Sequence, residues 1–161
     1  MDDLSRIQGE HRGKKIVLGG GAFDILHQGH IDYLRDIKAL GDVLIIAIKS
    51  DAEIRSYKEA GRPIQNEDVR AAIVDAIRYV DYVLVAPEPS GTPSTSLRTS
   101  EPPRLVVARE LKPDIVVTAS MKWKAYEEEL TKLGVQLNIV PIEKVNSTTA
   151  IIERIRNRPE A

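Results

Sequence analysis

A glycine-rich turn between an apolar run and a helical pattern constrains this chain more than any other stretch. The apolar residues 16–18 lead into three consecutive glycines at 19–21, and the segment after Gly29 carries apolar residues at helical spacing. That order predicts a strand, a tight turn and the first turn of a helix. Backbone N–H groups at a helix start have no partner within the helix, so they suit an anion such as phosphate.

Two histidines lie in this turn, three positions apart on either side of Gly29. His27 and His30 can therefore face the same spot from the first helical turn, and the glycine between them lets a ligand approach closely. A helix cap or a core position would explain either histidine alone, whereas the pair favours a phosphate site with two imidazole donors. The dinucleotide fingerprint fails here, because Asp24 stands where its third glycine should be.

The longer string Phe23-Asp24-x-x-His27-x-Gly29-His30 resembles the signature of the HxGH nucleotidylyltransferase superfamily. It is especially similar to two branches, the adenylyltransferase domain of ADP-heptose synthase and the glycerol-3-phosphate cytidylyltransferases. The resemblance covers residues 15–86 and 104–156, with 87–103 as an insertion. It implies that His27 and His30 are catalytic. It also implies nucleotide contacts at the turn, namely Gly21, Ala22, Phe23 and Gly29.

Composition sets limits on what the chain can be. With 161 residues, a single compact domain over 1–161 is the expectation. The absence of cysteine excludes disulfides, thiolate metal sites and cysteine nucleophiles. A net charge of −1 gives no general attraction to nucleic acid or to an anionic membrane. No apolar run approaches the roughly 20 residues of a membrane span, and the polar N-terminus lacks a signal-peptide layout, so we expect a cytoplasmic protein.

Apolar runs alternate with amphipathic segments along the chain, which predicts a Rossmann-like, doubly wound parallel sheet of about five strands with helices on both faces. The expected strands are 16–20, 43–48, 82–85, 115–117 and 135–140. The expected helices are 29–40, 51–58, one starting at 66, 105–111, 124–133 and 148–156. The turn with the histidines then lies at a carboxyl end of the sheet, where such folds bind ligands.

Two segments are expected to lie outside these elements. Residues 1–13 are predicted to be a loose lead-in, and 87–103, which is rich in Pro, Ser and Thr, to be an exposed mobile insertion. The position of 87–103 after a strand's carboxyl end suggests a lid that orders on the acceptor.

Cationic residues are candidates for holding an acceptor phosphate: Lys15, Arg62 and Arg70. Arginine matches phosphate oxygens with a bidentate fork. A solvated helix face would explain an isolated Arg70, but residues 62–64, Arg70 and 79–83 together resemble the family pattern, which implies that Arg70 helps hold phosphates. For Arg62 and Lys58 both interpretations remain open.

The last predicted helix opens with Ser147, Thr148 and Thr149. Hydroxyls at a helix start are good caps, and a hydroxyl-rich helix start at this edge also suits a second phosphate cradle. These residues resemble the Ser-Thr-Thr start that both family branches use against nucleotide phosphates. We therefore expect these three residues to have two roles, capping the helix and binding nucleotide phosphates. For Asp24, structural hydrogen bonding is favoured over orienting His27.

The resemblance departs from the family after the predicted strand 115–117. Trp123 fits the tryptophan of the cytidylyltransferase pattern, but Met121 and Lys122 replace its acidic residues. An exposed Trp123 could stack on a base, or it could pack the following helix against the sheet. Ile142 replaces an arginine of the cytidylyltransferases, with Lys144 nearby as a substitute.

The resemblance implies transfer of a nucleoside monophosphate from a nucleoside triphosphate to a phosphorylated small-molecule acceptor, with release of pyrophosphate. Mg²⁺ would bridge the nucleotide phosphates and need few protein ligands, so no metal site is predicted. ATP with a sugar (heptose-type) 1-phosphate is the main hypothesis. The alternatives are CTP with glycerol phosphate or a similar alcohol phosphate, transfer of AMP to flavin mononucleotide, and a non-catalytic nucleotide-binding regulator. Relatives are often dimers, which leaves a homodimer open.

Overall fold

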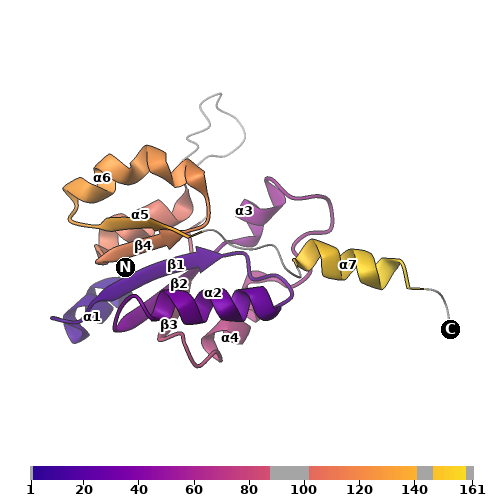
Figure 1. The fold of residues 1–161 in the computed structure, drawn as a ribbon, viewed down its shortest axis with the longest axis horizontal. Coiled ribbons are helices and arrows are strands. Elements are labelled where there is room, and N and C mark those ends of the chain that lie inside the picture. Colours follow the sequence, from indigo (N-terminus) through magenta and orange to yellow (C-terminus); the bar gives the residue numbers. More distant parts are fainter. Residues whose placement is uncertain (1, 88–101, 141–146, 159–161) are drawn as a thin grey trace.

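The computed structural model describes residues 2–87, 102–140 and 147–158. Strands and helices alternate along most of the chain (Figure 1). The strands are β1 (Ile16–Gly21), β2 (Val43–Ile48), β3 (Tyr82–Val85), β4 (Ile115–Thr118) and β5 (Gln136–Ile139). The helices are α1 (Asp2–Glu10), α2 (Gln28–Lys38), α3 (Asp51–Arg55), α4 (Glu67–Asp75), α5 (Pro103–Leu111), the 3₁₀ helix η1 (Met121–Tyr126), α6 (Glu127–Lys132) and α7 (Thr148–Arg156).

The strands form one parallel sheet in the order β3-β2-β1-β4-β5, which confirms the predicted Rossmann-like fold. β2 is buried along its whole length, which explains why its sequence is an uninterrupted apolar run. The strand order reverses between β1 and β4. These two strands pair only as far as Leu18 and Val116. Beyond that point β1 continues along β2 as far as Gly21, and β4 continues along β5 as far as Thr118.

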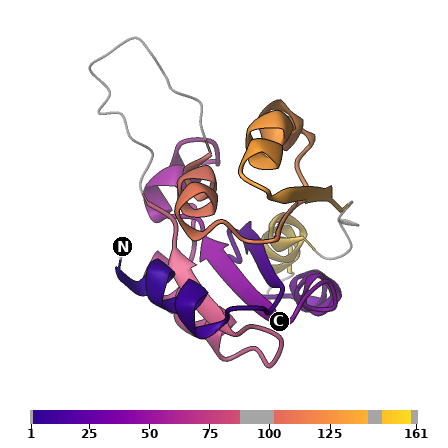
Figure 2. The same cartoon turned by 90° about the vertical axis from the view of Figure 1, so that its left-hand side faces the viewer.

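Helices cover both faces of the sheet (Figure 2). On one face, α1, α5 and the η1–α6 segment pack on a core that includes Leu18, Ile45 and Val116. On the other, α2 and α4 pack on a second core that includes Val17 and Leu44. Alternation of side chains along each strand sends neighbouring residues into different cores. α7 lies beyond the main body of the sheet, beside its carboxyl edge (Figure 1).

The first residues of the chain differ from the expected loose lead-in, because residues 2–10 form α1. Leu4 and Ile7 lie on one face of this helix, and Ile7 is buried in the core shared with α5. The sequence signal was weak because two apolar residues in a polar stretch do not bury enough surface to hold a helix alone. Packing against α5, about a hundred residues later in the chain, supplies the missing contacts.

Several element boundaries also differ from the prediction. The helix expected over 124–133 begins as the 3₁₀ helix η1 and continues as α6, and the one expected over 51–58 ends at Arg55. α5 begins at Pro103, so the end of the expected insertion 87–103 belongs to a helix. Proline fits the first turn of a helix because that turn needs no donor from it. Most of the predicted lid, residues 88–101 of the segment 87–103, lies outside the described residues. Among the helices that are described, none has the length and apolar character to cross a membrane.

Candidate active site

The loop between β1 and α2 has an unusual backbone. Phe23 and Ile25 have positive φ angles of 51° and 53°. This conformation is disfavoured for a bulky or β-branched side chain, so surrounding contacts must hold it. Phe23 is buried in the α2 core, and its ring lies beside the Gly21 backbone, where a Cβ would come within 3.0 Å of it. A side chain at position 21 would therefore press on this ring.

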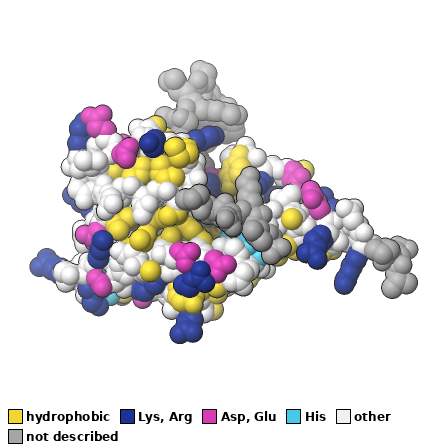
Figure 3. All heavy atoms as spheres, in the orientation of Figure 1, with side chains coloured by type: hydrophobic (Ala, Val, Ile, Leu, Met, Phe, Trp, Pro, Cys, Tyr) yellow, Lys and Arg dark blue, Asp and Glu magenta, His cyan; other side chains and the backbone are white. Residues whose placement is uncertain are grey.

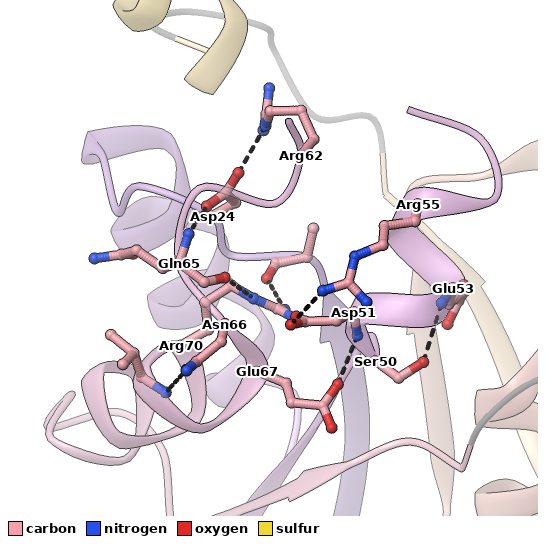
Figure 4. Close-up of polar contacts among 12 residues, drawn as sticks. Asp24, Ser50, Asp51, Glu53, Arg55, Arg62, Gln65, Asn66, Glu67 and Arg70 are labelled. Carbon is pink, nitrogen blue, oxygen red and sulfur yellow. Dashed lines mark hydrogen bonds and ion pairs between the residues drawn. The ribbon is translucent and has the colours of Figure 1, made fainter. Parts of the chain in front are cut away.

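Asp24 is the first of these contacts (Figure 4). Its carboxylate is almost fully buried and accepts hydrogen bonds from Nε of Arg62 at 2.8 Å and from the backbone N–H groups of Ile64 and Gln65 at 3.0 Å. Burial alone would raise the pKa of Asp24, but these backbone N–H groups and the Arg62 charge outweigh it, and the pKa is lowered. Asp24 therefore ties the loop to residues 62–65, in agreement with the structural role expected for it.

Arg70 braces the same loop from α4. Its guanidinium is completely buried and donates to the carbonyl oxygens of Ala22 at 2.6 Å and Gln65 at 3.0 Å, and to Asp51 at 2.7 Å (Figure 4). Its donors are thus directed at the protein, and the side chain has no surface to offer a substrate. The structure therefore corrects the expectation that Arg70 binds phosphate directly, because the fold places it beneath the loop.

The two histidines stand at the start of α2, with Gly29 between them in the first turn. Their rings are stacked with centroids 3.7 Å apart, and the Phe23 ring lies 5.1 Å from that of His30. Both Nδ1 atoms are buried, and neither has a hydrogen-bond partner among the described residues. The structure thus brings the two imidazoles together beside a helix N-terminus, as the sequence predicted.

The electrostatics of the pair favour neutral rings in the free protein. Burial, together with the nearby His27 ring, lowers the pKa of His30 to about 4, although Asp24 opposes this, and burial lowers the pKa of His27. Two cations this close would also repel each other. Each ring therefore carries one N–H donor at neutral pH.

The start of α7 is brought to this loop as well. Thr148 donates from its hydroxyl to the backbone oxygen of Asp24, and Ser147 caps the helix by accepting from the N–H of Ala150 at 3.3 Å. Thr149, the next residue, is exposed. The structure thus gathers Ser147, Thr148 and Thr149 at the loop, more than a hundred residues away in sequence. Ile142 and Lys144 lie outside the described residues.

Arg62 lies beside this loop, where Asp24 holds its guanidinium. The residue is 7% exposed, and within the described ranges its buried Nη1 atom has no hydrogen-bond partner. It lines a pocket together with Arg55, Lys58 and Glu59. Arg62 therefore lies between Asp24 and a pocket that three cationic side chains line, and it keeps a donor that no described residue accepts.

Two predicted residues lie elsewhere. Lys15 precedes β1 and therefore lies at the amino edge of the sheet, where its backbone binds Asp42. A six-residue strand spans roughly 20 Å, so Lys15 is a strand's length from the histidines. Trp123 is 5% exposed and belongs to the core under η1, so it has the packing position that was one of its two interpretations. A buried indole offers no free face to a base.

Sequence reasoning missed Arg104, the second residue of α5. It lies over the carboxyl end of β1, with its guanidinium carbon 4.5 Å from the centroid of the Trp123 ring. Its position next to two prolines, at the border of the insertion, gave no sign of a site. Only the packing of α5 reveals it.

Histidine side chains reach the surface where α7 meets the main body of the molecule (Figure 3).

The described residues include no group of three His, Asp or Glu side chains that could hold a metal ion.

Comparisons with known proteins agree with this architecture. Residues 18–154 match the family model described as cytidylyltransferase-like. The bifunctional protein HldE of Pseudomonas savastanoi pv. phaseolicola is 41% identical over 145 residues, covering 90% of this chain and 28% of that protein. The HldE of Campylobacter concisus is 32% identical over 157 residues, covering 98% of this chain and 30% of that protein. The chain thus spans less than a third of the length of these curated relatives.

A solved structure gives the same result in three dimensions. The crystal structure of the lipopolysaccharide core biosynthesis protein from Thermoplasma volcanium is similar with a TM-score of 0.61 and 30% identity, covering 83% of this chain and all of that one. With the family model matching most of the sequence, the chain belongs to the cytidylyltransferase-like family of nucleotidyltransferases.

Proposed function

We propose that this chain transfers a nucleoside monophosphate from a nucleoside triphosphate to the phosphate of a small-molecule acceptor. The observation that carries the proposal is the stacked pair His27 and His30 at the start of α2, each with a buried ring nitrogen that no residue in the described part of the chain engages. A site of this kind supplies hydrogen-bond donors to phosphate oxygens.

The reaction needs no covalent enzyme intermediate. A phosphate oxygen of the acceptor attacks the α-phosphorus, the bond from that phosphorus to the α,β-bridging oxygen breaks, and pyrophosphate leaves with the electron pair. The protein contributes position and charge stabilisation. His27 and His30 donate to the α-phosphate oxygens, while Ser147, Thr148 and Thr149 at the start of α7 hold the outer phosphates. An approaching triphosphate raises the pKa of both imidazoles, so their positive charge develops where the transition state needs it.

Mg²⁺ is proposed as a companion of the nucleotide. The ion prefers phosphate and water oxygens, and when bound it would neutralise charge on the departing pyrophosphate. The described residues offer no three-ligand cluster for it, so the nucleotide phosphates would supply most of its ligands.

The acceptor phosphate is proposed to bind in the pocket of Arg55, Lys58 and Arg62. Arg62 has a buried Nη1 donor that finds no acceptor among the residues the structure describes, and Lys58 is exposed. Lys58→Met should then raise the KM for the acceptor several-fold and leave the affinity for the nucleotide unchanged. An unchanged KM would remove this pocket from the proposal. Lys122→Met, on an exposed residue of η1, is a matched control.

ATP and a sugar 1-phosphate are the proposed substrates. A structural relative is named for lipopolysaccharide core biosynthesis, which favours a sugar acceptor. Trp123 favoured the alternative with CTP and an alcohol phosphate. Because Trp123 is buried, it is not available to stack on a base, so this support for the alternative is lost. Transfer to flavin mononucleotide and a regulator without turnover remain outcomes of the test.

The test is pyrophosphate release with Mg²⁺, using ATP and CTP each against sugar 1-phosphates, glycerol 3-phosphate and flavin mononucleotide. Wild type is compared with His27→Ala and His30→Ala. His11→Ala is the matched control, because His11 pairs with Tyr82 away from the loop. Release with one substrate pair that disappears in both variants but not in the control supports the proposal. Nucleotide binding without release would favour the regulator, and no nucleotide binding would overturn the proposal.

A further inference from the structure

Arg104 occupies a place on β1 that only a glycine strand makes available. A Cβ atom at Gly20 would lie 2.6 Å from Nη1 of Arg104 and 2.8 Å from its Cδ. The guanidinium therefore lies directly against the backbone at the carboxyl end of β1. The glycine run at the end of β1, which leads into the histidine loop, thus leaves room for an arginine from α5 because it has no side chains.

The partners of this guanidinium are mostly neutral. It lies over the Trp123 ring at 4.5 Å and interacts with the hydroxyl of Tyr33. Glu53 acts on it only through its charge and is itself paired with Lys49. Within the described ranges no ion pair joins Arg104 to a carboxylate, and its Nε is buried without a partner. Burial lowers the pKa of Arg104, but arginine stays protonated at neutral pH. Arg104 is thus a poorly matched cation.

The position of this cation in the sheet points to a ligand. α5 and α2 cover opposite faces of the sheet (Figure 2), and Arg104 from the one meets Tyr33 from the other beside Gly20. This is where β1 and β4 have ceased to pair, beyond Leu18. Open α/β sheets bind ligands at the point where strand order reverses.

We propose that Arg104 binds a phosphate group of the substrates at the carboxyl end of β1. The inference rests on the proposed function for its choice of ligand. A guanidinium offers two parallel N–H donors that match phosphate oxygens, and phosphate supplies the paired negative charge that the described side chains around Arg104 do not. The phosphate belongs either to the nucleotide or to the acceptor, and the experiment distinguishes the two.

Trp123 makes this binding visible without any reaction. It is the sole tryptophan of the chain, and Arg104 lies on its ring, so an anion that engages the guanidinium changes the tryptophan fluorescence. Wild type is titrated separately with inorganic pyrophosphate, ATP, CTP and glucose 1-phosphate. A saturable response to pyrophosphate or the nucleotides assigns Arg104 to the nucleotide, and a response to the sugar phosphate alone assigns it to the acceptor.

Variants then test the residue. Arg104→Met should weaken binding of the responding anion by about tenfold or more and abolish the fluorescence change, because a charge-assisted hydrogen bond is lost. Arg104→Lys keeps the positive charge but loses the two parallel donors. Its affinity for the anion should therefore lie between that of wild type and that of Arg104→Met. Arg109→Met removes a guanidinium from the same helix, where it pairs with Glu129, and should leave binding unchanged. Thermal unfolding of each variant separates a loss of binding from a loss of folding. If Arg104→Met does not fold, the anion affinity of Arg104→Lys tests the proposal in its place.

The outcomes separate this inference from the proposed function. Wild-type anion affinity in folded Arg104→Met, or no fluorescence response when calorimetry detects binding, would overturn the role of Arg104 while leaving pyrophosphate release as evidence for the transferase. A pyrophosphate response that depends on Arg104, in a protein that never releases pyrophosphate, would support Arg104 and overturn the transferase. Failure of wild type to bind any of the four probes would overturn both.

Discussion

The polar groups on the two sides of the β1–α2 loop have opposite surroundings. Beneath the loop, Asp24 and Arg70 are buried and make hydrogen bonds to several backbone groups. At its outer end, His27 and His30 have buried ring nitrogens for which the described part of the chain offers no partner. A buried polar group without a partner costs free energy, so proteins keep few of them. The first pair therefore builds the loop, and the second keeps the unpaired nitrogens on which the proposed function rests.

The largest effect is expected from Asp24→Ala. It leaves the guanidinium of Arg62 and the N–H groups of Ile64 and Gln65 buried without an acceptor. Breaking such a buried pair costs about 3–5 kcal/mol, which urea unfolding would measure. Asp24→Asn keeps an oxygen for the N–H groups and should lose less. A loss under about 1 kcal/mol in Asp24→Ala would contradict the scaffolding role.

The opposite pattern is expected for the histidines. His30→Ala should lower kcat/KM by about 10²–10³, the usual effect of removing a donor to a developing oxyanion. Its unfolding free energy should fall less than that of Asp24→Ala, because the change removes ring contacts with His27 and Phe23 but breaks no hydrogen bond of the buried Nδ1 atom to a described residue. Steady-state kinetics and urea unfolding on the same preparation check both halves. Equal losses of activity and stability would show that His30 is part of the scaffold.

The histidine pair should also make stability depend on pH. The pKa of His30 is about 4 in the folded protein, below its ordinary value of 6.5, so the unfolded chain binds more protons between these values. Stability is therefore complete above about pH 6.5 and falls as the pH falls, by at most about 2 kcal/mol between pH 7 and 5. Asp24 does not contribute in this window, because its lowered pKa lies below 3.8. Urea unfolding at both pH values should show a smaller difference in His30→Gln than in wild type, and equal differences would contradict the assignment.

The smallest effect is expected at an exposed ion pair next to the buried one beneath the loop. Asp51 pairs with two arginines, the buried Arg70 and Arg55, whose side chain is 64% exposed. Arg55→Ala should change the unfolding free energy by less than about 1 kcal/mol, because water screens an exposed pair. Arg70→Ala should cost several times more in the same urea titration, since it strands the carbonyl of Ala22 and the carboxylate of Asp51. Similar costs would show that burial does not set the difference.

Much of this protein was determined by the sequence alone. The glycine turn, the His27–His30 spacing and the alternating strands and helices are local patterns, so neighbouring residues were sufficient to predict the parallel sheet and the position of the histidine pair. The sequence also implied that Lys15 lies at the amino edge of the sheet, because Lys15 precedes β1. Its assignment to the site was an error of interpretation, since the site lies at the opposite end of that strand. The helix α1 was missed because its stability comes from α5 rather than from its own residues.

The tertiary structure decided what each arginine does. Arg70, Arg62 and Arg104 are the same side chain with the same phosphate-binding potential, and no local pattern separates them. Arg70 meets Ala22 and Asp51, 48 and 19 residues away, and becomes a brace. Arg62 meets Asp24, 38 residues away, and keeps one donor that no described residue accepts. Arg104 meets a glycine backbone and an indole ring. The role of a charged group follows from whether its partners satisfy it, and those partners are brought together only by folding.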